Sequence, residues 1–209
     1  PSEVRGVVNG VGAAGTAIAE FLLALGVGEL ILCDKNGILV AGDPSLSEAH
    51  AKMAARTNPR RVTGALADAL RGADLFVGVS APGIVSQEMV RSMAKDAMVF
   101  AMANPVPEIL PDEAAAAGAA VIGTGRSDYP NQINNVLAFP GIFRGALDVR
   151  ASDINNDMLV AAARAIASYI PEGELSAQNL LPSALDKNVS AAVAKAVSEA
   201  ARASGVARI

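Results

Sequence analysis

The feature of this sequence that most restricts its fold is a six-residue glycine loop, Gly10-Val11-Gly12-Ala13-Ala14-Gly15, which matches the pattern G-x-G-x-x-G. The loop follows a short apolar run and opens an alanine-rich segment of helical composition. This setting is typical of a turn that joins a parallel strand to a helix and binds a phosphate at the helix N-terminus. In such a turn the first glycine allows the tight bend, the second lets the backbone approach a pyrophosphate, and the third allows close helix packing.

An acidic residue follows this loop at the sequence separation that is typical of ribose-binding acids in dinucleotide-binding folds. Asp34 ends a second apolar run, residues 29–34, nineteen residues beyond Gly15. An acid in this position accepts hydrogen bonds from the adenosine ribose hydroxyls and repels a 2′-phosphate, which favours NAD over NADP. The adjacent Lys35 could pair with a 2′-phosphate, so NADP stays open as the alternative. A tight turn without a ligand would explain the glycine hexapeptide alone, but not its combination with Asp34.

Apolar runs and helical segments alternate as far as about Gly125, which predicts an α/β fold of the Rossmann type. Such a fold is a doubly wound, mostly parallel sheet with helices on both faces. The predicted strands cover residues 4–9, 29–34, 61–64, 74–79, 98–103 and 119–123. The predicted helices cover residues 13–25, 45–56, 65–71, 86–94 and 112–117. Ser45, with Glu48 three residues later, is expected to cap the second of these helices.

The composition changes in the last third of the chain. Residues 126–135 are polar and show no period, so we expect a loop there. Two closing helices are predicted at about 152–169 and 186–203, the first capped by Ser152 or Asp153. We expect these helices to pack on the sheet, so that residues 1–209 form one NAD(P)-binding domain that includes a helical segment at 152–209.

Composition and charge exclude several classes of protein. With 52% hydrophobic and 18% charged residues, the chain can bury a core and is not disordered. A net charge of −4 provides no basic stripe for nucleic acid. No apolar run is long enough for a membrane span, and the first residues do not have the pattern of a signal peptide. The single cysteine, Cys33, allows no internal disulfide, so a reducing, cytoplasmic location is expected.

Small polar residues follow the predicted strands of this sheet. Ser80 follows the run at 74–79, and Asn104 follows the run at 98–103. Because ligands of open α/β sheets bind outside the carboxyl ends of the strands, both are candidate cofactor contacts. Asn134 and Asn135 lie in a carboxamide-rich segment that suits a nicotinamide amide or a substrate carboxylate. Turn chemistry explains the Gly and Pro residues of the first two loops but explains less well why Ser80 and Asn104 stand at matching points, whereas ordinary loop capping is the alternative for Asn134 and Asn135.

Taken together, these segments resemble one family, the malic enzymes in their bacterial form, over essentially the whole chain. The segments that carry the resemblance are VVNGVGAAGTAIAEFLLALGV (7–27), LILCDKNG (30–37), ADALRGADLFVGVSAPG (67–83), VFAMANPVPEI (99–109) and GTGRSDYPNQINNVLAFPGIFRGALDVRA (123–151). Malic enzymes oxidise L-malate with NAD(P) and release pyruvate and CO2, using Mg²⁺ or Mn²⁺, and they are generally homo-oligomers. The resemblance implies the same substrate, cofactors and assembly for the protein to which this chain belongs.

Matching the motifs residue by residue gives the roles that the resemblance implies. The residues implied to hold the pyrophosphate are Gly10, Gly12, Ala13, Ala14 and Gly15, with Asp34 at the adenosine ribose. Asn104 is implied to lie at the nicotinamide ribose, and Ser80 is kept as a cofactor contact because of its place after the run at 74–79. Asn135 is implied to reach the nicotinamide, and Asn134 the substrate.

The resemblance places no catalytic and no metal-binding residue on these 209 residues. The family's general acid and base, a Tyr and a Lys, and its acidic metal ligands belong to an N-terminal catalytic domain that these residues do not include. We therefore expect the fragment alone to be inactive. Tyr129 and Tyr169 lie outside the matching motif, Asp128 and Asp148 fit capping better, and His50 is given no role in its expected surface helix. Two alternatives stay open: the Rossmann domain of an amino-acid dehydrogenase relative, and a nucleotide-binding module without catalysis.

Overall fold

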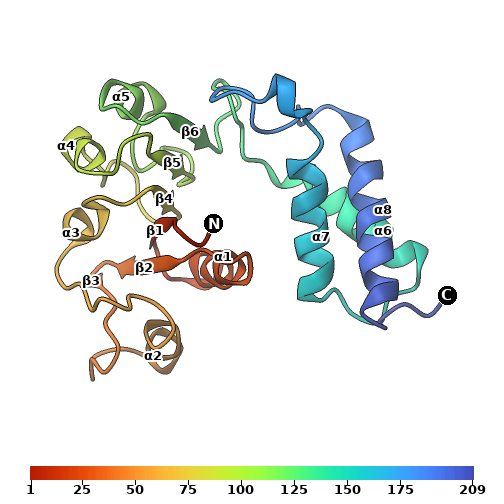
Figure 1. The fold of residues 1–209 in the computed structure, drawn as a ribbon, viewed down its shortest axis with the longest axis horizontal. Coiled ribbons are helices and arrows are strands. Elements are labelled where there is room, and N and C mark those ends of the chain that lie inside the picture. The colour runs from red at the N-terminus through yellow and green to blue at the C-terminus, as the bar shows by residue number, and fades with distance from the viewer. The chain divides into compact units, whose positions relative to one another are not determined.

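The computed structural model describes all residues from Pro1 to Ile209, and these divide into unit 1 (Pro1–Tyr129) and unit 2 (Pro130–Ile209). Unit 1 contains every strand, and unit 2 is helical (Figure 1). The boundary lies well before residue 152, where the helical segment was expected to begin. The expectation that the closing helices pack on the sheet stays a prediction.

Unit 1 is built on a six-stranded sheet in the order β3-β2-β1-β4-β5-β6. The strands are β1 (Arg5–Asn9), β2 (Glu29–Asp34), β3 (Gly37–Ile38), β4 (Leu75–Gly78), β5 (Met98–Ala101) and β6 (Val121–Thr124). All neighbouring strands are parallel except β2 and β3, which form an antiparallel pair. The mostly parallel α/β sheet predicted from the alternation is therefore confirmed, and the short strand β3 was not predicted.

Helices cover both faces of this sheet (Figure 1). They are α1 (Ala13–Ala24), α2 (Glu48–Ala54), α3 (Leu66–Leu70), α4 (Gln87–Arg91) and α5 (Pro111–Ala116). One buried cluster joins Val7 and Phe76 to residues of α3, α4 and α5. The other joins Val8 and Leu32 to residues of α1 and α2. Because successive strand residues point to opposite faces, β1, β2, β4 and β5 each contribute to both cores.

The register of the sheet aligns the last residues of β1, β4, β5 and β6 in one row, with the second-last residue of β2. Asn9 lies opposite both Cys33 in β2 and Gly78 in β4. Gly78 lies opposite Ala101 in β5, which in turn lies opposite Thr124 in β6. The loops that follow these residues therefore leave the sheet at the same edge. The strand order reverses between β1 and β4, and this is the place at which open α/β sheets bind their ligands.

Two local predictions in unit 1 are wrong, and in both places a side chain makes a different local hydrogen bond. Residues 61–64 form no strand, because Asn58 bonds both the N–H and the carbonyl of Val62, each at 2.8 Å. Ser45 does not cap α2, because its hydroxyl donates to Asp43 at 2.7 Å. Ser47 is the capping residue instead.

Unit 2 consists of helices that pack on one another (Figure 1). They are the 3-10 turn η1 (Asn135–Leu137), α6 (Phe139–Asp148), α7 (Asn156–Ala167), the 3-10 turn η2 (Glu172–Glu174) and α8 (Lys187–Ala203). The long helix α8 packs against both α6 and α7 around a buried cluster of its own. At Gly145 the helix α6 comes so close to Val197 of α8 that a Cβ atom would overlap it.

The predicted cap of α7 is also wrong. Asn155 caps this helix by accepting a hydrogen bond from the N–H of Met158 at 3.1 Å, rather than Ser152 or Asp153. The Ser152 hydroxyl donates to the carbonyl of Val206 at 3.2 Å. Asp186 caps α8, where the sequence predicts the helix to start. None of the helices combines the length and the apolar composition needed to cross a membrane.

Candidate functional site

A cleft of about 440 Å³ opens in unit 1 at the carboxyl ends of the strands. This volume lies within the range of small-molecule sites. The cleft is lined by Asn9, Gly10, Asp34, Lys35, Asn36, Gly37, Gly64, Ala65, Leu66, Ser80, Ala81 and Ile84. It brings together three residues that were predicted separately from the sequence, namely Gly10, Asp34 and Ser80.

The three glycines of the loop have different surroundings. Gly10 has a φ of +102°, and a Cβ atom there would lie 2.5 Å from the carbonyl oxygen of Val79. Gly15 lies against the carbonyl of Gly10, which leaves no room for a Cβ atom. Gly12, in contrast, has no atom within 4 Å of the position that a Cβ would take. The fold therefore requires Gly10 and Gly15, while Gly12 leaves open space beside the loop.

The helix α1 begins directly at this open space. Gly12 is its N-cap residue, no side chain caps it, and its first turn holds no acid. Ala13 and Ala14, the first helical residues, are exposed. Uncapped N–H groups and the dipole of a 12-residue helix favour an anion at this end. The residues present therefore fit the pyrophosphate of a dinucleotide.

Asp34, another residue of the cleft lining, is in contact with two other segments. Its Oδ1 accepts a hydrogen bond from the N–H of Asn36 at 2.7 Å, and its Oδ2 lies 3.7 Å from Nδ1 of His50. The other ring nitrogen of His50 lies 2.8 Å from the carbonyl oxygen of Val11. A carbonyl oxygen only accepts, so Nε2 carries the hydrogen of this bond. His50 therefore contacts both Asp34 and the glycine loop, a role that the sequence did not reveal.

A hydrogen-bond network links the ends of β1, β4 and β5. The side-chain amide of Asn9 donates to the Ser80 hydroxyl at 2.8 Å. The N–H and the hydroxyl of Ser80 both donate to Oε1 of Glu108, at 2.8 and 3.1 Å. The N–H of Ala103 donates to Oε2 of the same carboxylate at 3.0 Å. Sequence analysis predicted Ser80 but missed Asn9 and Glu108. Glu108 was missed because no sequence pattern indicates that an acid is buried.

The remaining predicted residues lie in two different places. Asn104 is exposed directly after Ala103 and is joined to Pro105 by a cis peptide bond. Asn134 and Asn135 belong to unit 2, and both are exposed. Asn134 accepts a hydrogen bond from the N–H of Val136 at 3.0 Å and so caps η1, which is the alternative role considered for this segment. The roles of these three residues in ligand binding stay predictions.

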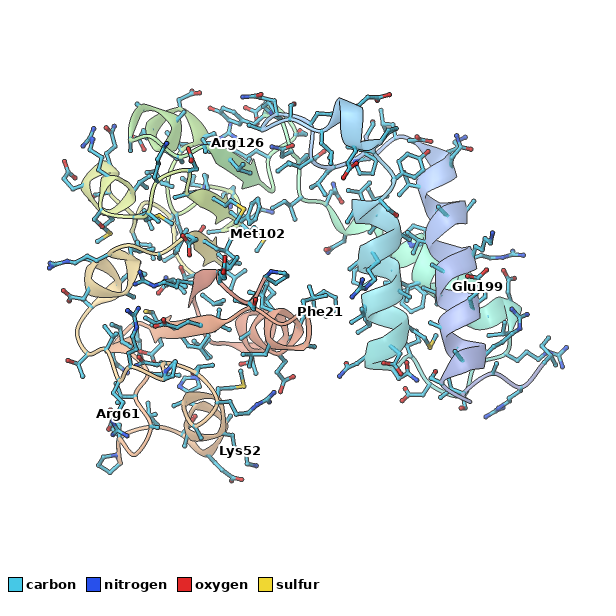
Figure 2. The ribbon with its side chains drawn as sticks, in the orientation of Figure 1. Phe21, Lys52, Arg61, Met102, Arg126 and Glu199 are labelled. Carbon is cyan, nitrogen blue, oxygen red and sulfur yellow. The ribbon has the colours of Figure 1, made fainter.

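Charged side chains near the end of β6 form pairs on the surface. Arg126 (Figure 2) donates two hydrogen bonds to Asp128, at 2.9 and 2.6 Å, and these bonds lower the pKa of the Asp128 carboxyl. The Tyr129 hydroxyl donates a hydrogen bond to Asp112 at 3.2 Å. The pKa of Tyr129 is raised, mainly by desolvation and secondly by this hydrogen bond. No group of three or more His, Cys, Asp and Glu side chains in the chain could hold a metal ion.

Comparison with known proteins connects this geometry with one family. Residues 2–202 match the family model for the malic enzyme NAD-binding domain. The chain is 54% identical to the bifunctional malic/malolactic enzyme of Bacillus subtilis, a match that covers 100% of the chain and 51% of that enzyme. It is 43% identical to the NADP-dependent malic enzyme of Escherichia coli, with 99% of the chain and 29% of that enzyme covered.

A solved structure gives the same result. The NAD-dependent malic enzyme of Thermotoga maritima matches with a TM-score of 0.90 and 47% identity, over 94% of this chain and 52% of that one. The chain therefore spans about half the length of these relatives, or less.

Proposed function

Because the chain belongs to the malic enzyme family, as its NAD-binding domain, we propose that it holds the nucleotide during oxidative decarboxylation of L-malate to pyruvate and CO2. When bound, the nicotinamide accepts the hydride that leaves malate, while the protein supplies binding and orientation. One observation carries the proposal. Gly10 and Asp34 line one cleft, and two residues beyond Gly10 the loop has open space at Gly12, beside the uncapped start of α1.

The order of the strands suggests how the nucleotide would lie. Gly10, Gly12 and Gly15, with Ala13 and Ala14, would hold the pyrophosphate at the end of β1. On one side of β1 lies β2, which ends at Asp34, and on the other lie β4 and β5, which lead to Ser80 and Asn104. A dinucleotide that spans the point of strand reversal would place its adenosine half at β2 and its nicotinamide half at β4 and β5.

Asp34 supports NAD as the preferred nucleotide. A carboxylate at the ribose accepts hydrogen bonds from two free hydroxyls and repels a 2′-phosphate. NADP stays the alternative, because the exposed Lys35 lies beside Asp34 and lines the same cleft. Both cofactors occur among the relatives, one of which is named NADP-dependent and another NAD-dependent.

The contacts with malate, the metal ion and the general acid and base would come from residues outside the cleft. Asn134 would contact malate and Asn135 the nicotinamide, as the resemblance implies. As the resemblance implies, the metal and the general acid and base would come from a catalytic domain outside these 209 residues. The whole enzyme would be a cytoplasmic homo-oligomer. This chain alone would bind the nucleotide without converting malate.

Two measurements on the chain test this proposal. Isothermal titration calorimetry with NAD and with NADP is expected to show binding of both, with NAD bound more tightly. An assay of malate-dependent NAD reduction with Mg²⁺ or Mn²⁺ is expected to show no turnover. Absence of nucleotide binding would contradict the proposal. Turnover by the chain alone would show that no further domain is needed, and tighter NADP binding would contradict the role of Asp34.

The same assay on the full-length protein separates the alternatives. Malate-dependent NAD reduction would exclude a nucleotide-binding module without catalysis. Activity with an amino acid in place of malate would favour a relative of the amino-acid dehydrogenases, an alternative that the family match argues against.

A further inference from the structure

Glu108 is the only acidic residue among the buried side chains of the chain, with 0% of its surface exposed. A buried carboxylate is costly unless its oxygens accept hydrogen bonds. Both oxygens of Glu108 do so, one from Ser80 and the other from Ala103. The acid lies next to the proposed nucleotide site and takes no part in the function described so far.

The two oxygens of Glu108 serve two different loops. Oε1 accepts from the N–H and the hydroxyl of Ser80, in the loop that follows β4. Oε2 accepts from Ala103, the residue that directly precedes Asn104 after β5. The backbone strengthens this link, because the carbonyl of Glu108 accepts a hydrogen bond from the N–H of Val85 at 3.0 Å. One carboxylate therefore fixes the position of the β4 loop relative to the Asn104 turn.

The strand beneath provides the space for this carboxylate. Gly78 is the last residue of β4, and a Cβ atom there would overlap the carboxyl group of Glu108. Gly78 belongs to the row of aligned strand ends, opposite Asn9 and Ala101. The carboxylate thus lies at the sheet edge from which both loops emerge.

We propose that Glu108 is a positioning residue that holds the Ser80 loop and the Asn104 turn in place for the nicotinamide half of the dinucleotide. This inference rests on the proposed function, in which the adenosine half lies on the other side of β1, toward Asp34. Glu108 acts through Ser80 and Ala103 and does not itself touch the nucleotide. Its loss should therefore weaken contacts with one half of the ligand and spare the other.

The test compares NAD with ADP, a probe that lacks the nicotinamide half, by calorimetry on the 209-residue chain. In Glu108→Gln a single amide oxygen remains as acceptor, so one of the two loops loses its partner. The dissociation constant for NAD is expected to rise about tenfold, and that for ADP by less than about twofold. Glu113→Gln is the matched control, because Glu113 is exposed on α5 nearby and its change should alter neither constant.

A second variant moves the same carboxylate without changing its chemistry. Gly78→Ala places a methyl group against Glu108 and is expected to weaken NAD binding selectively as well, so it decides the question if Glu108→Gln fails to fold. Equal weakening of NAD and ADP, or no change in either, would overturn the inference while leaving the proposed function intact. Failure of the wild-type chain to bind NAD or NADP would overturn both.

Discussion

The ring nitrogen Nε2 of His50 lies 2.8 Å from the carbonyl oxygen of Val11, in the middle of the glycine loop. Its other nitrogen lies 3.7 Å from the carboxylate of Asp34. A side chain of α2 therefore connects the loop proposed for the pyrophosphate with the acid proposed for the ribose. This contact joins residues 39 positions apart in the sequence and ties α2 to the glycine loop.

Replacing His50 with Ala is expected to weaken NAD binding about fivefold, because the Val11 carbonyl loses the partner that orders the loop. Calorimetric titration of the chain measures the change. The control is Lys52→Ala, since Lys52 lies on the same helix with 74% of its side chain exposed (Figure 2). An equal loss in both variants would attribute the effect to damage of α2 rather than to the imidazole.

Replacing Gly12 with Ala is expected to weaken NAD binding more than about tenfold while changing stability little. The φ of Gly12 is −81°, which an alanine adopts freely, and no protein atom opposes the new methyl group. That group would instead occupy the space proposed for the pyrophosphate. Gly173→Ala is the matched control, because Gly173 also has open surroundings but lies in unit 2. Unchanged NAD affinity in Gly12→Ala would contradict the proposed position of the pyrophosphate.

Replacing Gly15 with Ala should have the opposite result, a loss of fold stability of about 2 kcal/mol or more. The added methyl group would press on the Gly10 carbonyl and separate α1 from the loop. Alanine favours helices more than glycine does, so propensity alone predicts stabilisation. Urea unfolding distinguishes a steric loss of stability from a gain through helix propensity. A free energy of unfolding equal to or above that of the wild type would show that the overlap with the Gly10 carbonyl is easily relieved.

Replacing Asp34 with Asn should shift the nucleotide preference toward NADP by about tenfold or more, because the charge that repels a 2′-phosphate is removed. The ratio of the NAD and NADP dissociation constants measures this shift. Asp96→Asn removes an exposed acid just before β5, at the amino ends of the strands, whereas Asp34 lies at a carboxyl end. This control should leave the ratio unchanged. An unchanged ratio of the two dissociation constants in Asp34→Asn would contradict the proposed position of the ribose at this residue.

The hydrogen bond from Tyr169 to Asp186, at 2.6 Å, should make the stability of the chain depend on pH. This bond lowers the pKa of Asp186 below its ordinary 3.8 and raises that of Tyr169 above 10.0. The Asp186 contribution is present above pH 3.8 and is lost as the pH falls through its lowered pKa. The Tyr169 contribution is present below pH 10.0 and is lost as the pH rises through its raised pKa.

The variant Tyr169→Phe should therefore be less stable than the wild type between these limits, with the difference shrinking at both extremes. Denaturant unfolding at a series of pH values measures it. A difference that stays constant from acid to alkaline pH would mean that the hydroxyl contributes nothing through this pair.

The parts of the fold that were predicted correctly are those whose signals are contiguous in the sequence. The glycine loop, with the strand before it and the helix after it, combines backbone requirements and hydrophobic pattern within one short stretch. The strand that ends at Asp34 was predicted with its observed boundaries for the same reason. Gly10, Asp34 and Ser80 could therefore be identified as candidates, and their common cleft follows from the parallel order of their strands.

The parts that were missed depend on contacts between distant residues. Asn58 replaces the strand expected at 61–64 because its side chain takes both backbone groups of Val62. The contact of His50 with Val11 exists only once α2 is placed over the loop. Glu108 was missed because acids are almost always exposed, so nothing in its neighbourhood in the sequence indicates burial.

The exact fit between Gly78 and Glu108 has a consequence for how this sequence can change over generations. A side chain at 78 would displace the carboxylate of Glu108, although thirty positions separate the two residues. A protein that gains a side chain at 78 and keeps Glu108 would have its Ser80 loop and Asn104 turn displaced. We expect substitutions at these two positions to occur together on the family tree, with single changes removed by selection.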